Sequence, residues 1–290
     1  MIQQRSVSRV RYDTRMYCGI TYTQARTALA MALPLQLHLI SPIGGGERFP
    51  LLVYIGGGGW RISAPDRHLP ELAFFAENGF TVASIGYRTT AHDGFPAQIE
   101  DVRTAIRFLR LHADQFHIDP EHVYVCGGSA GAYLAAMAAL TGGRAKFRGA
   151  EYPDIPDTVS GAICLYGIYD FPKLMVTLST EKNTEGQSVV WEFLKNQDML
   201  TLIEASPTRY IAADSVPFLL LHGTEDRLVP HQQSILFHDQ LAQSQVPAEL
   251  VLLEGAGHAS PDFSQPEIQS LELEFLKNNL HPQQQRSGMI

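Results

Sequence analysis

One short stretch constrains the fold of this chain more than any other. An apolar run, Val123-Tyr-Val-Cys126, is followed by Gly127-Gly-Ser-Ala-Gly131 and then by small residues at helical spacing over 132–140. This order predicts a strand, a sharp turn and a helix, with Ser129 at the turn. The pattern fits Gly-x-Ser-x-Gly, in which glycines flank a strained serine because a Cβ there would collide with the strand or the helix. Ser129 is therefore a candidate nucleophile, and a glycine-rich loop that grips a phosphate is the alternative.

The rest of the chain alternates between predicted strands and predicted helices. Runs such as Leu51-Leu-Val-Tyr-Ile55 are apolar throughout, which is typical of strands covered on both faces. We expect strands at 35–40, 51–55, 80–85, 123–126, 159–166, 217–221 and 248–254, and helices at 69–78, 96–113, 132–140, 232–243 and 266–279. This alternation predicts an α/β fold with a mostly parallel central sheet covered by helices on both faces.

Two segments interrupt this rhythm. Residues 1–34 are expected to form either a hairpin or an irregular cap. Residues 167–210 are expected to be an insertion, with one or two helices over 189–202, that packs over the carboxyl ends of the strands. No linker is visible, so we expect a single domain over 1–290, with 1–34 as an N-terminal cap segment and 167–210 as a cap insertion. The polar tail, 282–290, is expected to fray.

Composition excludes several classes of function. Acidic residues outnumber basic ones by 30 to 22, the net charge is −8 and no basic run occurs, so we expect no nucleic-acid partner. The three cysteines show neither a disulfide framework nor a Cys/His metal spacing, so we expect no metal site. The apolar run 28–35 contains Pro34 and is far too short to cross a bilayer, so we expect no stable membrane insertion. No apolar signal-peptide core follows Met1, which makes a cytoplasmic location the expectation.

Three side chains suited to acyl chemistry each come shortly after a predicted strand of their own: Ser129, Asp226 and His258. The carboxyl ends of parallel strands meet at one edge of the sheet, where ligands bind, so we expect these side chains to lie close together. A serine hydroxyl needs a base beside it, and a histidine acting as that base needs an acid to hold its ring. The chain order serine, aspartate, histidine is that of α/β-hydrolases.

Other residues compete for these roles. Glu225, Asp214 and Asp170 are alternative carboxylates, and Asp226 has an alternative role as a turn or helix-cap residue. We favour Asp226 because its strand directly precedes the strand before His258. His258 is one of 11 histidines and has an alternative place in a surface loop, but the flexible Gly-Ala-Gly exit before it lets the ring reach inward.

The four glycines at 56–59 follow a predicted strand and are candidates for stabilising negative charge. Attack on an ester carbonyl puts negative charge on its oxygen, and backbone N–H groups aimed at that oxygen contribute roughly 2.7–4 kcal/mol each in comparable enzymes. We expect an oxyanion hole made by the N–H groups of Gly58, Gly59 and Ala130. A nucleotide-phosphate loop is the alternative, and it is disfavoured because Arg61 stands where the third glycine of Gly-x-Gly-x-x-Gly would be.

Several motifs occur together in this chain. They are Tyr54-Ile-Gly-Gly-Gly-Gly-Trp60, Phe95-Pro-Ala-Gln-Ile-Glu-Asp-Val102, Ile118-Asp-Pro120, Gly127-Gly-Ser-Ala-Gly131, Ala205-Ser-Pro207, His222-Gly-Thr-Glu-Asp226 with Val229-Pro230, and Gly255-Ala-Gly-His258. In these motifs and their order, over residues 35–275, the chain resembles α/β-hydrolases of the hormone-sensitive-lipase and carboxylesterase type, most of all the acetyl- and feruloyl-esterase-like (BD-FAE-like) branch. The resemblance implies the α/β-hydrolase fold, a serine carboxylesterase with Ser129, Asp226 and His258 as its catalytic triad, and no cofactor.

The glycine loop departs from this family at one position. Gly56 stands where the family usually has a histidine, whose imidazole helps to brace the loop. We therefore expect either weaker activity toward generic small esters or a loop that is ordered by the substrate. This expectation falls away if another group, such as Tyr54 or Arg88, takes the place of the imidazole.

Three functions stay open on the sequence alone. The first is hydrolysis of carboxylic esters of small or medium acyl groups through an acyl-enzyme intermediate, with a small-molecule ester as substrate. The second, on the same scaffold, is hydrolysis of an amide, as in arylformamidases. The third is a non-catalytic ligand-binding homologue, which the presence of all three triad residues disfavours and Gly56 keeps open. A homodimer is compatible with the sequence.

Overall fold

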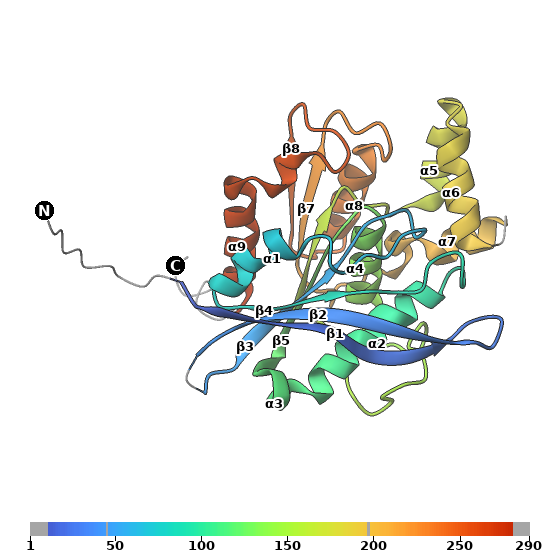
Figure 1. Cartoon of the computed structure of the whole chain (residues 1–290). Helices are drawn as coiled ribbons and strands as arrows, with labels where there is room; N and C mark the ends of the chain where they lie inside the picture. Colours follow the sequence, from blue (N-terminus) through green and yellow to red (C-terminus); the bar gives the residue numbers. More distant parts are fainter. Residues whose placement is uncertain (1–10, 45, 196–197, 281–290) are drawn as a thin grey trace, which may run out of the picture.

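A central sheet organises the molecule in the computed structural model, which describes residues 11–44, 46–195 and 198–280 (Figure 1). Within these residues the strands are β1 (Thr14–Arg26), β2 (Ala32–Pro42), β3 (Phe49–Ile55), β4 (Thr81–Ile85), β5 (Ile118–Gly128), β6 (Gly161–Leu165), β7 (Phe218–Gly223) and β8 (Ala248–Leu253). Their order across the sheet is β1-β2-β4-β3-β5-β6-β7-β8. β1 pairs with β2, and β2 with β4, in antiparallel fashion, and the other neighbours are parallel. The predicted mostly parallel sheet is confirmed.

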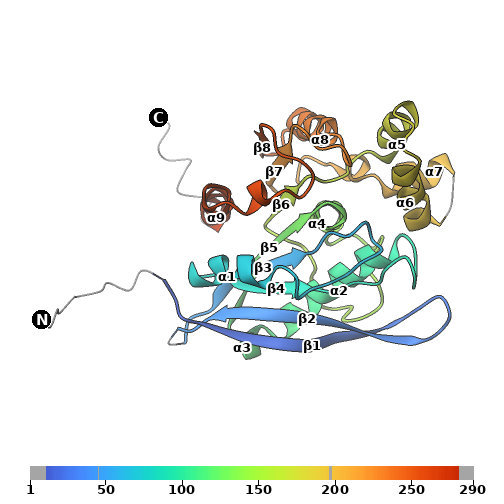
Figure 2. The same ribbon diagram turned by 45° about the horizontal axis from the view of Figure 1, so that its top comes forward.

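Helices cover both faces of this sheet. In the described residues they are α1 (Leu69–Glu77), α2 (Ala97–Leu111), α3 (Ala113–Phe116), α4 (Ala130–Thr141), α5 (Phe171–Thr180), α6 (Thr184–Leu194), α7 (Met199–Ala205), α8 (Gln232–Gln243) and α9 (Pro266–Leu280), with short 3-10 helices η1 (Pro207–Tyr210) and η2 (Pro261–Ser264). Figure 2 shows α1 and α9 on one side of the sheet and α2, α4 and α8 on the other.

The sheet divides the interior into two apolar cores. Alternate residues of β3 point to opposite faces, so Leu51 and Val53 belong to the core that includes residues of α2, α4 and α8, whereas Leu52 and Tyr54 belong to the core that includes residues of α1 and α9. All residues of β4, β6 and β7 are buried, as expected for strands covered on both faces. This double burial explains why continuous apolar runs in the sequence locate these strands.

The N-terminal segment adds an edge strand to the sheet. β1 pairs with β2 along most of its length, from Thr14 opposite Pro42 to Arg26 opposite Ala32. Of the two alternatives for residues 1–34, the described part therefore forms a hairpin. The first ten residues of that segment and the predicted frayed tail at 282–290 lie outside the described residues. The assignment of one domain to the whole chain stays a prediction.

Three helices of the 167–210 insertion gather at one end of the molecule, at the upper right in Figure 1. α5 begins where the Lys173 N–H donates to Asp170 Oδ1 at 2.9 Å. The ring of Phe193 on α6 stacks on Trp60 with centroids 4.0 Å apart, which joins the insertion to the loop after β3. The sequence predicts helices only over 189–202 in this insertion, whereas the structure also has α5 and starts α6 at Thr184.

Candidate active site

Ser129 lies at the turn between β5 and α4. Its backbone angles are φ 55° and ψ −121°, a strained conformation for a residue with a Cβ. The neighbouring glycines are required by packing: a Cβ on Gly131 would lie 1.9 Å from the Ile55 carbonyl oxygen, and a Cβ on Gly127 would lie 2.5 Å from the Gly131 carbonyl oxygen. The Ser129 N–H donates to the Leu165 carbonyl oxygen at 2.9 Å. The turn therefore holds the serine in one position at the end of β5.

The structure brings the three predicted side chains into hydrogen-bond contact. Ser129 Oγ lies 2.9 Å from His258 Nε2, and His258 Nδ1 lies 2.6 Å from Asp226 Oδ2. Because an ionised carboxylate can only accept, Nδ1 carries a hydrogen, and in the neutral ring Nε2 is left to accept the hydrogen of the serine hydroxyl. This arrangement can withdraw the proton from Ser129 as the hydroxyl attacks an electrophile.

Asp226 is buried and hydrogen bonded through both of its oxygens. The N–H groups of Leu228 and Val229 each donate to Oδ1 at 2.9 Å, and His222 and His258 contact Oδ2. Burial alone would raise the pKa of Asp226, but the hydrogen bonds from His222 and His258 outweigh burial and hold the pKa well below its usual range. Asp226 is therefore ionised at neutral pH and fixes the ring of His258.

A second histidine, His222, contacts the same carboxylate and was not among the predicted site residues. Its Nε2 lies 2.9 Å from the Val229 carbonyl oxygen and 3.2 Å from Asp226 Oδ2, so this nitrogen donates. Its Nδ1 lies 2.7 Å from Ser234 Oγ. His222 is fully buried, so it holds Asp226 from within the core. The sequence signal was available, because this histidine opens the motif that ends at Asp226.

The other three candidate carboxylates lie away from the ring of His258 or are exposed to solvent. Asp170 caps α5, and Glu225 and Asp214 are exposed at the surface. Of the four candidates, only Asp226 contacts His258 in the described structure.

The glycine loop after β3 packs against the serine turn. A Cβ on Gly57 would lie 2.7 Å from the Gly128 carbonyl oxygen, so this close approach requires glycine. Gly58 and Gly59 have φ values of 140° and 59°, and both line the same cavity as Ser129. Ala130 is the first residue of α4, so the helix leaves its N–H without an intrahelical partner. The three residues predicted as donors, and Gly57, which was predicted as part of the glycine loop but not as a donor, therefore line the same cavity as Ser129.

Tyr87 braces this loop, a role that the family usually gives to a histidine at the position of Gly56. Its hydroxyl donates to the Gly56 carbonyl oxygen at 2.9 Å, and the residue is 2% exposed. Neither of the substitutes suggested by the sequence has this role: among the described residues, Tyr54 has an edge contact with the His68 ring, and Arg88 is held elsewhere. The loop thus has a hydrogen-bonded support, supplied from the exit of β4.

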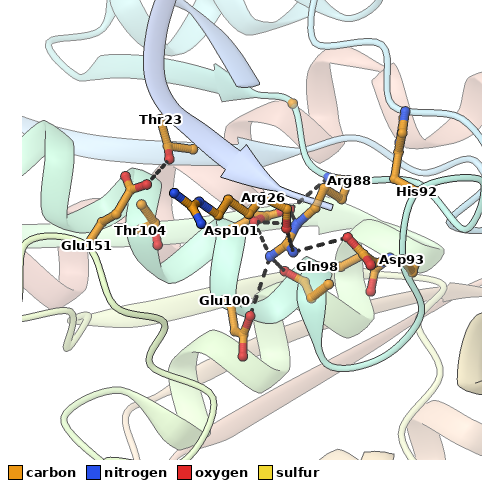
Figure 3. A network of polar contacts seen from close by, with 12 residues as sticks. Thr23, Arg26, Arg88, His92, Asp93, Gln98, Glu100, Asp101, Thr104 and Glu151 are labelled. Carbon is orange, nitrogen blue, oxygen red and sulfur yellow. Dashed lines mark hydrogen bonds and ion pairs between the residues drawn. The ribbon is translucent and has the colours of Figure 1, made fainter. Parts of the chain in front are cut away.

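Arg88 is the centre of a polar network between α2 and the end of β1 (Figure 3). Its guanidinium donates to both oxygens of Asp101, with distances of 2.7 to 3.0 Å, and to Asp93 Oδ2 at 3.2 Å. Burial raises the pKa of Asp101 to about 6, although the hydrogen bonds from Arg88 act in the opposite direction. Since another Arg88 N–H donates to the Arg26 carbonyl oxygen at 3.2 Å, the network fastens the N-terminal hairpin to α2.

A cavity of about 440 Å³ has Ser129 and His258 in its lining. One side of the lining comes from α5 and α6 of the insertion: Leu174, Leu178, Gly186, Val189 and Val190. The other side comes from α1, α9 and the ends of β3 and β6: Tyr54, Glu71, Leu72, Phe75, Tyr166, Gln269 and Glu272. The first side is apolar, and the second mixes aromatic and polar groups.

Glu272 is an unusual member of this lining. It belongs to α9, is 4% exposed, and has no hydrogen-bond or ion-pair partner among the described residues. Burial raises the pKa of Glu272 to about 8, from an ordinary value of 4.5. Glu272 was not among the residues predicted from the sequence, although its i,i+4 spacing to the buried Leu276 places an acid on the apolar face of this helix.

This raised pKa predicts a pH-dependent stability. Between about pH 5 and pH 8 the folded chain holds one proton on Glu272 that the unfolded chain releases, so the free energy of unfolding falls by about 1.4 kcal/mol per pH unit as pH rises. We expect Glu272→Gln to remove this slope, measured by urea unfolding at pH 6 and pH 7.5. The matched control, Glu71→Gln, changes an exposed acid of the same cavity and should keep the slope. Equal slopes in the wild type and Glu272→Gln would contradict the assignment.

No group of three or more His, Cys, Asp or Glu side chains in the part of the chain that the structure describes is placed to hold a metal ion. None of the helices found there has both the length and the apolar character needed to cross a membrane.

Two known proteins with similar sequences are named for the hydrolysis of esters. "Probable carboxylic ester hydrolase LipM" of Mycobacterium tuberculosis (strain ATCC 25618 / H37Rv) is 32% identical over 212 residues, which are 72% of this chain and 49% of LipM. "Esterase LipC" of the same organism is 31% identical over 220 residues, 72% of this chain and 52% of LipC. The chain thus spans about half the length of these curated relatives.

Solved structures with the same fold cover nearly the whole chain. A truncated carbohydrate esterase from gut microbiota has a TM-score of 0.78 at 21% identity, with 92% of this chain and 96% of that chain covered. Esterase 2 of the planctomycete Thermogutta terrifontis, solved with propionate bound, has a TM-score of 0.73 at 23% identity, with 92% of this chain and 94% of that chain covered. These likenesses show the α/β-hydrolase fold.

The family model BD-FAE matches residues 37–241, which include the glycine loop, Ser129 and Asp226. His258 lies beyond the matched residues but completes the hydrogen-bonded series in the structure. This match and the esterase fold agree with the resemblance read from the motifs. The chain belongs to the BD-FAE family of α/β-hydrolases.

Proposed function

We propose that this chain is a serine hydrolase that cleaves carboxylic esters of small or medium acyl groups through an acyl-enzyme intermediate. The observation that carries the proposal is the hydrogen-bonded series Ser129, His258 and Asp226 on the wall of a cavity. Relatives that are named as esterases and the BD-FAE family support the same class of reaction.

The chemistry follows from the roles of the three side chains. Ser129 Oγ attacks the ester carbonyl carbon while His258 Nε2 takes the hydroxyl proton, and ionised Asp226 stabilises the imidazolium that forms. Collapse of the tetrahedral intermediate breaks the bond to the alcohol, which leaves with the proton from His258. Water then attacks the acyl group on Ser129, with His258 again as the base, and the carboxylic acid is released.

The negative oxygen of each tetrahedral intermediate needs donors in front of Ser129. We assign this role to the N–H groups of Gly58, Gly59 and Ala130, because all three residues line the cavity beside the serine. The positive φ of both glycines orients their peptide groups in a way that residues with a Cβ rarely adopt. Tyr87 supports the loop, so its donors are held before the substrate arrives.

The substrate in this proposal is a small-molecule ester. The homodimer, the lack of a nucleic-acid partner and the cytoplasmic location stay predictions from the sequence.

An activity-based probe tests the proposal directly. We expect a fluorophosphonate to label Ser129, located by peptide mass spectrometry, and we expect p-nitrophenyl acetate to be turned over faster than N-formylkynurenine. Faster turnover of N-formylkynurenine would favour the arylformamidase alternative. No labelling and no ester turnover would favour a non-catalytic binding protein.

A further inference from the structure

The cavity beside Ser129 contains an acid that the proposed reaction does not use. Glu272 is 4% exposed and lines the cavity, yet its carboxyl has no partner among the described residues. A buried polar group that lacks a hydrogen bond is costly, so such groups in native proteins call for a partner. Glu272 lines the cavity, and a ligand there can therefore be that partner.

Two phenols belong to the same part of the cavity. Tyr54 and Tyr166 line the same cavity as Glu272 and pack in one core with Leu273 and Leu276, which belong to the same helix as Glu272. Burial is the largest cause that raises the pKa of both phenols, and Glu272 adds to it in each case. Neither hydroxyl donates or accepts a hydrogen bond within the described residues. Some other tyrosine hydroxyls in the described core are fully buried and have no hydrogen-bond partner, whereas Tyr54 and Tyr166 both line the cavity.

Tyr166 connects this group to the reacting centre. Its ring has an edge contact with the His258 ring at a centroid distance of 4.9 Å. Its hydroxyl lies 2.6 Å from the point that a Cβ on Gly128 would occupy, and Gly128 directly precedes Ser129. A substrate bonded to Ser129 therefore lies beside Tyr166, and a chain extending from it toward α9 meets Glu272.

We propose that Glu272, Tyr54 and Tyr166 form a polar subsite that binds a hydroxyl group on the acyl or the alcohol part of the ester. This inference rests on the proposed function and narrows its substrates to esters that carry a free hydroxyl group at a distance from the ester bond. The three groups together offer donors and acceptors, which is what a hydroxyl requires because it is both.

The protonation state of the acid favours a hydroxyl over a cation. Burial raises the pKa of Glu272 to about 8, so near pH 7 its carboxyl is mostly neutral and can both donate and accept. Arg67 and Glu71 also line the cavity, and their opposite charges leave no excess of negative charge to attract an ammonium group. A cationic substrate would require ionised Glu272, whereas a hydroxyl is bound by the neutral acid.

Two pairs of esters of nearly equal size test the subsite. One pair varies the alcohol, with 4-hydroxybutyl acetate against pentyl acetate, and the other varies the acyl group, with methyl 6-hydroxyhexanoate against methyl heptanoate. In at least one pair we expect the wild type to prefer the hydroxylated ester by about 10-fold or more in kcat/KM, followed by pH-stat titration at pH 7. Glu272→Leu should bring this ratio close to one, with little loss on the ester that lacks the hydroxyl.

Two further variants keep the test decisive. Tyr54→Phe removes one hydroxyl and keeps the ring, so it should lower the ratio several-fold even if Glu272→Leu does not fold. Glu71→Leu removes an exposed acid of the same cavity and should leave the ratio unchanged.

The outcomes separate the subsite from the proposed function. Turnover of the esters with a ratio near one in the wild type, or with a ratio that neither Glu272→Leu nor Tyr54→Phe changes, overturns the subsite and leaves the esterase proposal standing. An equal fall in Glu71→Leu also overturns it. No turnover of any of the four esters overturns the subsite, and if p-nitrophenyl acetate is not hydrolysed either, both proposals are overturned.

Discussion

Replacing Ser129 by alanine is expected to lower kcat on p-nitrophenyl acetate by about 10⁶-fold, because members of such a triad act as a unit and the nucleophile has no substitute. The turn itself should survive, since only an oxygen atom is removed and the backbone of Ser129 keeps its hydrogen bond to Leu165. Steady-state kinetics measure this fall, with an enzyme-free blank to subtract spontaneous hydrolysis of the ester.

A second serine of the same cavity provides the matched control. Ser260 lines the cavity, but its hydroxyl donates to Asp262 Oδ2 at 2.6 Å and makes no hydrogen bond to His258 within the described residues. Ser260→Ala should therefore keep kcat within a few-fold of the wild type. The nucleophile would be misassigned if Ser129→Ala retained a tenth of the wild-type kcat. It would also be misassigned if the fall in kcat of Ser260→Ala equalled that of Ser129→Ala.

Most of the fold could be predicted because double burial leaves a plain sequence signal. The strands at 51–55 and 217–221 are apolar throughout, the strand at 80–85 is apolar apart from Thr81 and Ser84, and the structure has β3, β7 and β4 there. The helix at 232–243 also has the predicted bounds. The edge strand β1 gives a weaker signal, since most of its residues are exposed and its apolar and polar residues do not alternate cleanly.

The insertion was harder to predict for a different reason. α5 and α6 are short, and their stability depends on packing against the rest of the molecule more than on their own periodicity. Phe193 is buried because it stacks on Trp60, a residue 133 positions earlier in the chain, in the loop after β3. A contact of this kind cannot be read from local spacing.

The candidate site was partly readable. Ser129, Asp226 and His258 each follow a strand, so the topology alone brings them to one edge, and the structure places them in contact. The supporting groups depend on long-range packing. Tyr87 reaches Gly56 across 31 positions, where the sequence suggested Tyr54 or Arg88.

Replacing Asp226 by asparagine is the second large effect, with an expected fall in kcat of about 10⁴-fold. An asparagine amide cannot accept hydrogen bonds at both ends: its oxygen can serve the N–H groups of Leu228 and Val229, which leaves its NH₂ facing His258 and His222. The NH₂ would then donate to His258 Nδ1, which puts the ring hydrogen on Nε2, where Ser129 needs an acceptor. The NH₂ would also face the Nε2–H of His222, and two donors cannot form a hydrogen bond with each other. We therefore expect the new side chain to be displaced, which contributes part of the fall in kcat.

The two contributions to this loss can be separated by experiment. Glu225→Gln alters the adjacent exposed acid and should leave kcat unchanged, which controls for the loss of one negative charge near the site. His222→Gln, which keeps a donor beside Asp226, should lower kcat far less than Asp226→Asn if the carboxylate acts mainly by fixing the tautomer of His258. A fall as large as that of Asp226→Asn would show instead that the buried His222 determines where the carboxylate stands. A wild-type kcat in Asp226→Asn would exclude Asp226 as the acid of the triad, although it is the candidate carboxylate that contacts His258 in the described structure.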